Sequence, residues 1–190
     1  GIAVLVLEEI IVGLIIGFAT GLIFAGIRYA GDLIGFDMGY SIASVYDPET
    51  NATVPVVGEI LYTFMALLFL LLNGHHFVLQ AIQLSYKAVP IGGLSITAIA
   101  AEKFVGMTGL LLVVAVKFAA PVIVAMFLTN TALGILTRVI PQMNIFGVVF
   151  PLKIGVGVIV LMTSVPVMIY VFKKLLVLFE TNVLDLVKAL

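Results

Sequence analysis

Four long stretches of the chain contain almost no formally charged side chain, and they predict helices. They are residues 10–27, 60–86, 104–136 and 154–172. A helix rises about 1.5 Å per residue and the hydrocarbon core of a bilayer is roughly 30 Å thick, so about 20 apolar residues are needed to cross it. The pattern therefore predicts an all-α, membrane-associated protein made of helical hairpins, some of whose helices are broken.

The third stretch, 104–136, is longer than a simple span and contains Lys117 and Pro121. Pro121 lacks the N–H that would bond to the carbonyl of Lys117, which favours a break at this point. We expect either a kinked helix or a hairpin of two shorter helices. The Lys117 ammonium is either a functional charge or, as we favour, a side chain that reaches toward the membrane surface.

A turn signal interrupts the second stretch. Asn73-Gly74 is a dipeptide typical of turns, and His75 and His76 follow it where ionisable groups are rare. A metal site would need further ligands, and the chain has no other histidine. We therefore favour a hydrogen-bonded, structural role for the histidines over metal binding or a proton relay.

Glycines recur at every fourth position near the start of the chain, in two rows. The rows are Gly13, Gly17 and Gly21, continued by Ala25, and then Gly31, Gly35 and Gly39. A helix with such a row has a bare stripe on which another backbone can lie closely. The rows predict close helix packing.

The segment 28–59 differs from its surroundings, with one arginine, five acidic residues, Pro48 and Pro55. The prolines exclude one continuous helix. The part before Asp47 is nearly all apolar, and an irregular apolar backbone must be enclosed by protein or line a cavity, because lipid offers its polar groups no partner. We predict a loop near 34–57, either an interfacial re-entrant turn or, as we favour, a gate or plug.

The last third of the chain is expected to contain a connection at 137–151, a span ended by Lys173 and Lys174, and a final amphipathic helix. The polar face of that helix is formed by Lys174, Thr181, Asp185 and Lys188. Its leucines and valines lie opposite, so we expect a surface helix that rests on lipid or on a partner.

Composition narrows the class of protein. Hydrophobic residues make up 63% of the chain and charged residues 10%, with a mean hydropathy of +1.33, whereas soluble domains carry about 25% charged residues. The net charge of −1, without a basic tract, argues against nucleic-acid binding. The chain has no cysteine, no phosphate-binding glycine loop and no catalytic cluster, so we expect no enzyme activity, metal or cofactor. We predict no signal peptide.

Several short motifs, in a fixed order, resemble one protein family. They are Gly35-Phe36-Asp37-Met38-Gly39-Tyr40-Ser41 leading to Asp47-Pro48, then Asn73-Gly74-His75, Pro90-Ile91-Gly92, and the block from Asn130 to Phe146. From about residue 10 to residue 172 the chain is similar to the FliR family of flagellar export-gate proteins and to its injectisome counterpart, the SctT family. The family usually has a further apolar helix before this region, so we expect one contact to a ring partner to be missing.

The resemblance implies a subunit of a helical hetero-oligomer with FliP-type and FliQ-type proteins, beside an FlhB-type export protein, in the bacterial inner membrane at the flagellar basal body. Residues 1–100 would be a FliP-like part with the plug loop. Residues 101–190 would be a FliQ-like helical hairpin with the C-terminal amphipathic helix. Such a subunit would help to form and plug the type III secretion channel for unfolded export substrates.

Three sets of residues are therefore candidates for function. The plug set is Met38, Gly39, Tyr40, Ser41, Ile42, Val45, Tyr46, Asp47 and Pro48. The helix-packing set is Gly13, Gly17, Gly21, Gly31 and Gly35. The structural polar set is Asn73, His75, Asn130, Arg138 and Gln142. The apolar members of the plug set suit closure of a pore by filling it and excluding water.

A secondary membrane transporter is the alternative, with Lys117, His75 and His76 as coupling groups and a discontinuous helix at Pro121. An inverted repeat should then place a second glycine row in the other half of the chain, where we find only Gly155 and Gly157. A purely structural membrane subunit would differ from a gate only in whether the loop lies in a pore.

Overall fold

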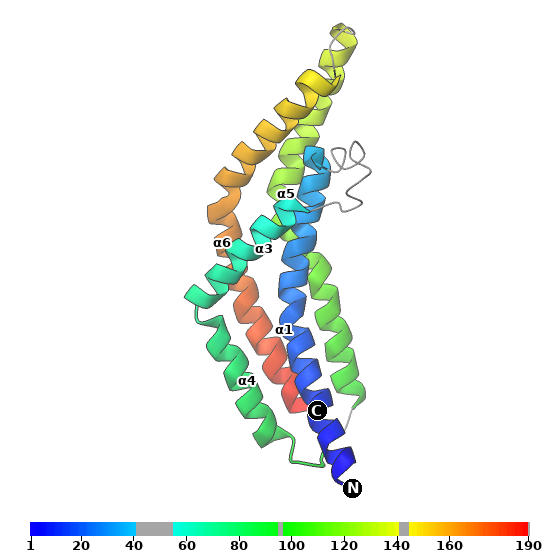
Figure 1. The fold of residues 1–190 in the computed structure, drawn as a ribbon, viewed down its shortest axis with the longest axis vertical. Helices are drawn as coiled ribbons and strands as arrows, with labels where there is room; N and C mark the ends of the chain where they lie inside the picture. The colour runs from blue at the N-terminus through cyan, green and yellow to red at the C-terminus, as the bar shows by residue number, and fades with distance from the viewer. Residues whose placement is uncertain (41–54, 95–96, 141–144, 190) are drawn as a thin grey trace. The chain divides into compact units, whose positions relative to one another are not determined.

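The computed structural model describes residues 1–40, 55–94, 97–140 and 145–189 (Figure 1). Every regular element within these ranges is a helix. The elements are α1 (Ile2–Met38), α3 (Val56–Leu71), α4 (Gly74–Ala88), α5 (Ala98–Val139), a π-helical turn η2 (Ile145–Val149) and α6 (Phe150–Ala189). The predicted all-α class is confirmed.

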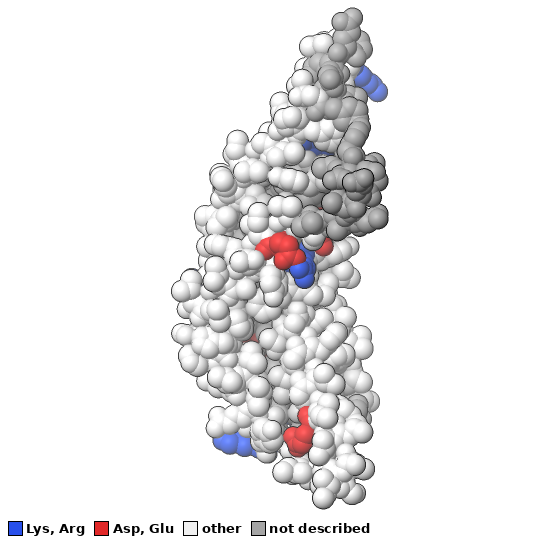
Figure 2. Space-filling view, in the orientation of Figure 1, with Lys and Arg blue, Asp and Glu red and all other residues white. Residues whose placement is uncertain are grey.

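Three segments of the described chain are helical, long and apolar enough to cross a membrane. They are Ile2–Met38, Ala98–Val139 and Gly147–Ala189. Helices α3 and α4 form a further, bent pair, with an angle of 69° at their break. The face drawn in Figure 2 is mostly neither acidic nor basic, and its charged side chains gather in a few small groups. Such a surface suits lipid or neighbouring protein, which agrees with the predicted membrane association.

The break between α3 and α4 lies at the predicted turn. Asn73 has a φ of 60°, and its N–H donates to the Leu70 carbonyl at 3.1 Å. A Cβ on Gly74 would lie 2.2 Å from the Phe69 ring, so glycine is required for the chain to pass that close. Both residues of the dipeptide therefore contribute to the bend.

The chain divides into two compact units, and the first contains both ends of the chain. It consists of Gly1–Gly26, Thr63–Val114 and Phe172–Leu190. Aromatic contacts join its helices: Phe18 of α1 stacks on Phe104 of α5 with ring centroids 5.3 Å apart. Phe77 of α4 meets Phe179 of α6 edge-on at 6.3 Å. Such pairs contribute about 0.5–1.5 kcal/mol each beyond the area that they bury.

The amphipathic end of α6 belongs to this first unit. Its predicted polar residues are exposed, whereas Phe179, Val183 and Leu186 on the opposite face are buried. Val177 and Leu178 of the same segment are exposed. The expectation that the helix rests on lipid or on a partner stays a prediction.

The second unit contains the ends of α1 and α6 that the first lacks. It consists of Ile27–Tyr62 and Ala115–Val171, described apart from the gaps given above. Its core holds fully buried side chains from α1 and α5, among them Ile34, Phe118, Val122 and Met126. These buried side chains exclude solvent from the end of α1 and from the middle of α5.

Charged side chains do not end the helices where we expected. Helix α1 runs through Glu8, Glu9 and Arg28, and residues 34–38 of the predicted loop are its last turn. Arg28 has an acidic partner, so it need not leave the helix to find one. Helix α6 likewise continues past Lys173 and Lys174, whose side chains are exposed beside the helix.

Helix α5 is continuous through Pro121, so the alternative of a hairpin of two shorter helices within 104–136 is wrong. A proline inside a helix costs about 3 kcal/mol. Phe118, Ala119 and Val122, next to the proline, are completely buried, and their packing offsets this cost. Lys117 is exposed.

Candidate functional site

Helices α1 and α3 approach most closely where two glycines face each other, inside the second unit. A Cβ on Gly31 would lie 2.3 Å from the Gly58 Cα and 2.7 Å from its nitrogen. A Cβ on Gly58 would lie 2.7 Å from the Asp32 carboxylate and 3.1 Å from the Arg28 carbonyl. No side chain fits at Gly31 without a movement of the backbone, because the atoms in its way are all backbone atoms, whereas at Gly58 the nearest obstacle is the Asp32 side chain.

Opposite charges cross the same α1–α3 contact. The Arg28 guanidinium forms an ion pair with Glu59 and lies 5.4 Å from the centroid of the Tyr62 ring, one helical turn further along α3. The side chains of the ion pair are 50% and 40% exposed, so the pair contributes at most about 1 kcal/mol in water. The pair joins α1 to α3 next to the Gly31–Gly58 contact.

The end of α1 is packed against α6. Met38 is 1% exposed, and its Cγ and Cε atoms lie 2.6 Å from where a Cβ on Gly157 would be. Gly39 has a φ of +89°, which favours glycine, and a Cβ there would lie 3.0 Å from the Phe150 ring. Gly39, directly after α1, and Gly157 of α6 thus let the chain leave α1 close against α6.

These contacts hold the chain on both sides of segment 41–54. Residues 31–39 are fixed against α3 and α6 before it, and residues 57–59 are fixed against α1 after it. The site is therefore a set of close helix contacts that holds the chain at residues 31–39 and again at residues 57–59.

The same region lies within the family match. Residues 1–178 match the family described as bacterial export proteins, family 1. The chain belongs to this family. It is 37% identical over 178 residues to the flagellar biosynthetic protein FliR of Bacillus subtilis. The matched region covers 90% of this chain and 67% of that protein.

Two further relatives are similar to a comparable extent. FliR of Escherichia coli is 33% identical over 162 residues, 85% of this chain and 62% of that protein. The surface presentation of antigens protein SpaR of Shigella sonnei is 33% identical over 149 residues, 78% of this chain and 57% of that protein. The chain thus spans 57–67% of the length of these three relatives. The resemblance to the FliR and SctT families is confirmed.

The plug set of this export-family chain is only partly described. Met38 is buried at the end of α1, Gly39 is buried in the turn after it, and Tyr40 is half-buried. The other members, Ser41, Ile42, Val45, Tyr46, Asp47 and Pro48, lie outside the described residues.

The two glycine rows of the family member differ in their surroundings. Gly31 lies on Gly58, and a Cβ on Gly35 would lie 3.7 Å from Val57. Positions Gly13, Gly17 and Gly21 are exposed, and a Cβ on any of them would meet no described atom within 4 Å. The second row is thus used within the chain, whereas the first leaves an open stripe on α1.

The structural polar set is distributed over both units. Asn73 forms the α3–α4 bend. The Nδ1 atom of His75 is buried and has no hydrogen-bond partner in the described part of the chain, so the hydrogen bond expected for His75 is absent at this atom. Asn130 lines a groove of about 240 Å³ between α5 and α6. Arg138 is exposed in the last turn of α5, and Gln142 lies outside the described residues. No group of three metal-ligating side chains occurs in the described ranges.

Sequence reasoning missed three contributors to the site: Gly58, Tyr62 and Gly157. Gly58 stands alone in the sequence, and Tyr62 lies in an apolar helix, so neither gives a signal by spacing. Gly157 is one of a pair with Gly155, but only the contact with Met38 separates their roles. Arg28 and Glu59 could have been paired in advance, because they are opposite charges that flank the predicted loop.

Proposed function

We propose that this member of bacterial export family 1 is a membrane-embedded subunit of the flagellar, or type III, export gate. In this proposal it helps to form the channel, and residues 38–51 plug that channel until unfolded substrates pass. The observation that carries the proposal is the pair of close contacts, Gly31–Gly58 and Met38–Gly157, that hold the chain before and after segment 41–54. A plug needs fixed anchors, which these contacts provide, and apolar side chains, which Ile42, Val45 and Tyr46 provide.

The chemistry of the segment supports closure rather than binding of a small solute. Ile42, Val45 and Tyr46 are apolar or aromatic, and the residues between them, Ala43 and Ser44, are small. Side chains of this kind close a pore because water leaves a narrow apolar constriction. Family membership favours export over the alternative of a secondary transporter that uses Lys117 and the two histidines.

The partners proposed are FliP-type and FliQ-type subunits in a helical hetero-oligomer, with an FlhB-type export protein beside them, in the bacterial inner membrane at the flagellar basal body. Residues 1–100 would then be the FliP-like part and residues 101–190 the FliQ-like part. The open stripe of Gly13, Gly17 and Gly21 supports such an assembly, because small residues let a neighbouring helix approach closely.

The test is the ion conductance of the assembled gate after a change in the segment. Two variants are compared with the unchanged chain: a deletion of residues 41–46, and a replacement of the same residues by glycine and serine at equal length. Both should make the gate leaky to ions, since both remove the apolar body. Co-purification of the other subunits verifies assembly. Unchanged conductance in assembled variants contradicts the proposal.

A further inference from the structure

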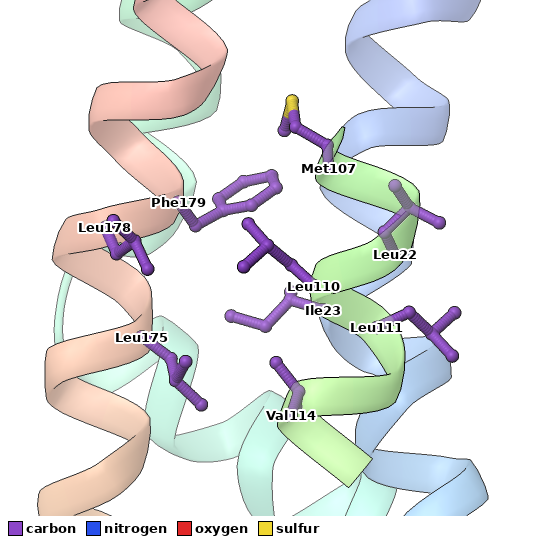
Figure 3. A pocket seen from close by; sticks show the side chains of 9 residues that line it. All are labelled: Leu22, Ile23, Met107, Leu110, Leu111, Val114, Leu175, Leu178 and Phe179. Atoms are coloured by element: carbon purple, nitrogen blue, oxygen red, sulfur yellow. The ribbon is translucent and has the colours of Figure 1, made fainter. Parts of the chain in front are cut away.

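Helices α5 and α6 pack closely in the first unit and leave a groove in the second. In the first unit, apolar side chains of α1, α5 and α6 surround a space of about 20 Å³, with Leu110 and Phe179 pointing toward each other (Figure 3). This space holds one water molecule at most. In the second unit the same two helices border a groove of about 240 Å³. The groove, unlike the space in Figure 3, has room for side chains of another segment.

The lining of the groove combines an apolar wall with one basic side chain. Leu133, Val149 and Phe150 form the apolar wall, and Lys153 supplies the charge. Lys153 is half-buried, and no acidic side chain forms an ion pair with it in the described part of the chain. A partly buried ammonium without a counter-charge is unfavourable, because burial removes part of its hydration. The groove therefore favours an occupant that brings a carboxylate.

The chain leaves α1 directly beside this groove. A Cβ on Gly39 would lie 3.0 Å from the ring of Phe150, which lines the groove. The Met38 side chain lies against Gly157. Phe150, Lys153 and Gly157 are spaced i, i+3 and i+7 along α6, so they share one face of this helix. Lys153 thus lies on α6 between the two points that the end of α1 contacts.

Segment 41–54, which begins two residues after Gly39, carries the charge that the groove lacks. It contains Asp47 and Glu49, separated by a proline, and it contains no basic residue. The groove contains Lys153 and no acidic residue. Asp37, the last acidic residue of α1, forms no ion pair in the described part of the chain. The charges of the groove and of the segment are therefore complementary.

The length of the segment lets its acidic residues reach the groove from both anchors. Asp47 comes eight residues after Gly39. Glu49 comes eight residues before Val57. Eight residues of chain extend at most about 27 Å. The two anchors lie close together, because Val57 lies against Gly35, one helical turn before Gly39. Neither half of the segment thus has to be stretched to bring a carboxylate to the groove.

We propose that the groove between α5 and α6 in the second unit binds the acidic triplet Asp47-Pro48-Glu49 of the same chain, with a carboxylate of the triplet on the Lys153 ammonium. A tethered segment meets its site at a high effective concentration, so one ion pair beside an apolar wall holds it where a free peptide would bind weakly. The docking uses the charges of the segment. It leaves the apolar side chains of residues 42–46 available for the role proposed above, so the two proposals can fail separately.

Two glycines of the second unit provide a matched pair of cysteine positions. Gly134 lines the groove, and Gly155 lies outside it. Both are exposed, and a Cβ on either would meet no described atom within 4 Å. Thr50→Cys, directly after the triplet, supplies the second thiol and leaves both carboxylates in place, and the chain itself contains no cysteine. Two double variants therefore compare the groove with another exposed position of the same unit.

The experiment is disulfide formation with copper phenanthroline in membranes that contain the full-length protein and its other subunits. Non-reducing electrophoresis separates a cross-link within the chain from one between two chains, and mass spectrometry identifies the joined peptides. Thr50→Cys should cross-link to Gly134→Cys within the chain at least about fivefold faster than to Gly155→Cys. Lys153→Glu should slow the cross-link to Gly134→Cys by about fivefold or more, since it replaces an ion pair by repulsion.

Exchange of the charges separates docking from a change in folding, and circular dichroism verifies the helix content of each variant. Asp47→Lys combined with Glu49→Lys should slow the cross-link to Gly134→Cys as Lys153→Glu does. All three substitutions together should restore it, because the ion pair forms again with its signs exchanged. Equal cross-linking of Gly134→Cys and Gly155→Cys overturns the proposal, and so does a cross-link between two chains or no recovery after the exchange. A selective cross-link within the chain that follows the charges supports it.

Discussion

Gly31→Ala tests the Gly31–Gly58 contact, which holds the chain before and after segment 41–54. The new Cβ would lie 2.3 Å from the Gly58 Cα, whereas ordinary contact begins at 3.4 Å. Helices α1 and α3 would have to separate locally by about 1 Å, because the obstructing atoms are backbone and cannot turn away. Overpacking of this kind costs about 1–3 kcal/mol, and we expect the upper half of that range.

Alanine also improves helix propensity by about 1 kcal/mol over glycine, so a control must remove this gain from the comparison. Gly21→Ala serves this purpose, since its Cβ meets no described atom within 4 Å on the same helix. Unfolding is measured by circular dichroism as detergent micelles are titrated with a denaturing detergent. Gly31→Ala should be less stable than Gly21→Ala by about 2–3 kcal/mol. Equal stability of the two variants would refute the close contact.

Two further predictions concern α6 and the open stripe. Gly157→Ala should destabilise the protein by only about 1 kcal/mol relative to Gly155→Ala. The atoms in its way belong to the flexible Met38 side chain, which can move. A loss of stability as large as that of Gly31→Ala would contradict this reason. Gly17→Leu should leave the stability of the chain unchanged but abolish its co-purification with the other gate subunits. The control, Gly109→Leu, should change neither the stability nor the co-purification. Retained co-purification of Gly17→Leu would show that the stripe is not an interface.

The class of the fold was readable from the sequence because its causes are local. Apolar runs of 18 or more residues with almost no charged side chain have few alternatives to membrane-compatible helices. The Asn73-Gly74 bend is also local, since a left-handed residue followed by glycine interrupts a helix by itself. The polar face at the end of α6 was found for the same reason, from spacing alone.

The helix ends and the site could not be read in this way, because distant residues decide them. Arg28 stays inside α1 since Glu59 and Tyr62 reach it from α3. Gly31 is indispensable only because Gly58 happens to face it, whereas Gly17, with an identical local pattern, faces open space. Pro121 does not end α5 because buried neighbours outweigh one lost hydrogen bond. In each case packing between segments far apart in sequence overrides the local signal.

The central claim is that segment 41–54 lies in the path of exported substrates. The chain contains no cysteine, so a single one introduced as Val45→Cys gives an unambiguous site for cross-linking to a substrate that is stalled during export. We predict a cross-link from Val45→Cys, and none from Gly109→Cys, because Gly109 is exposed on the surface of α5. A cross-link from Gly109→Cys without one from Val45→Cys would contradict it.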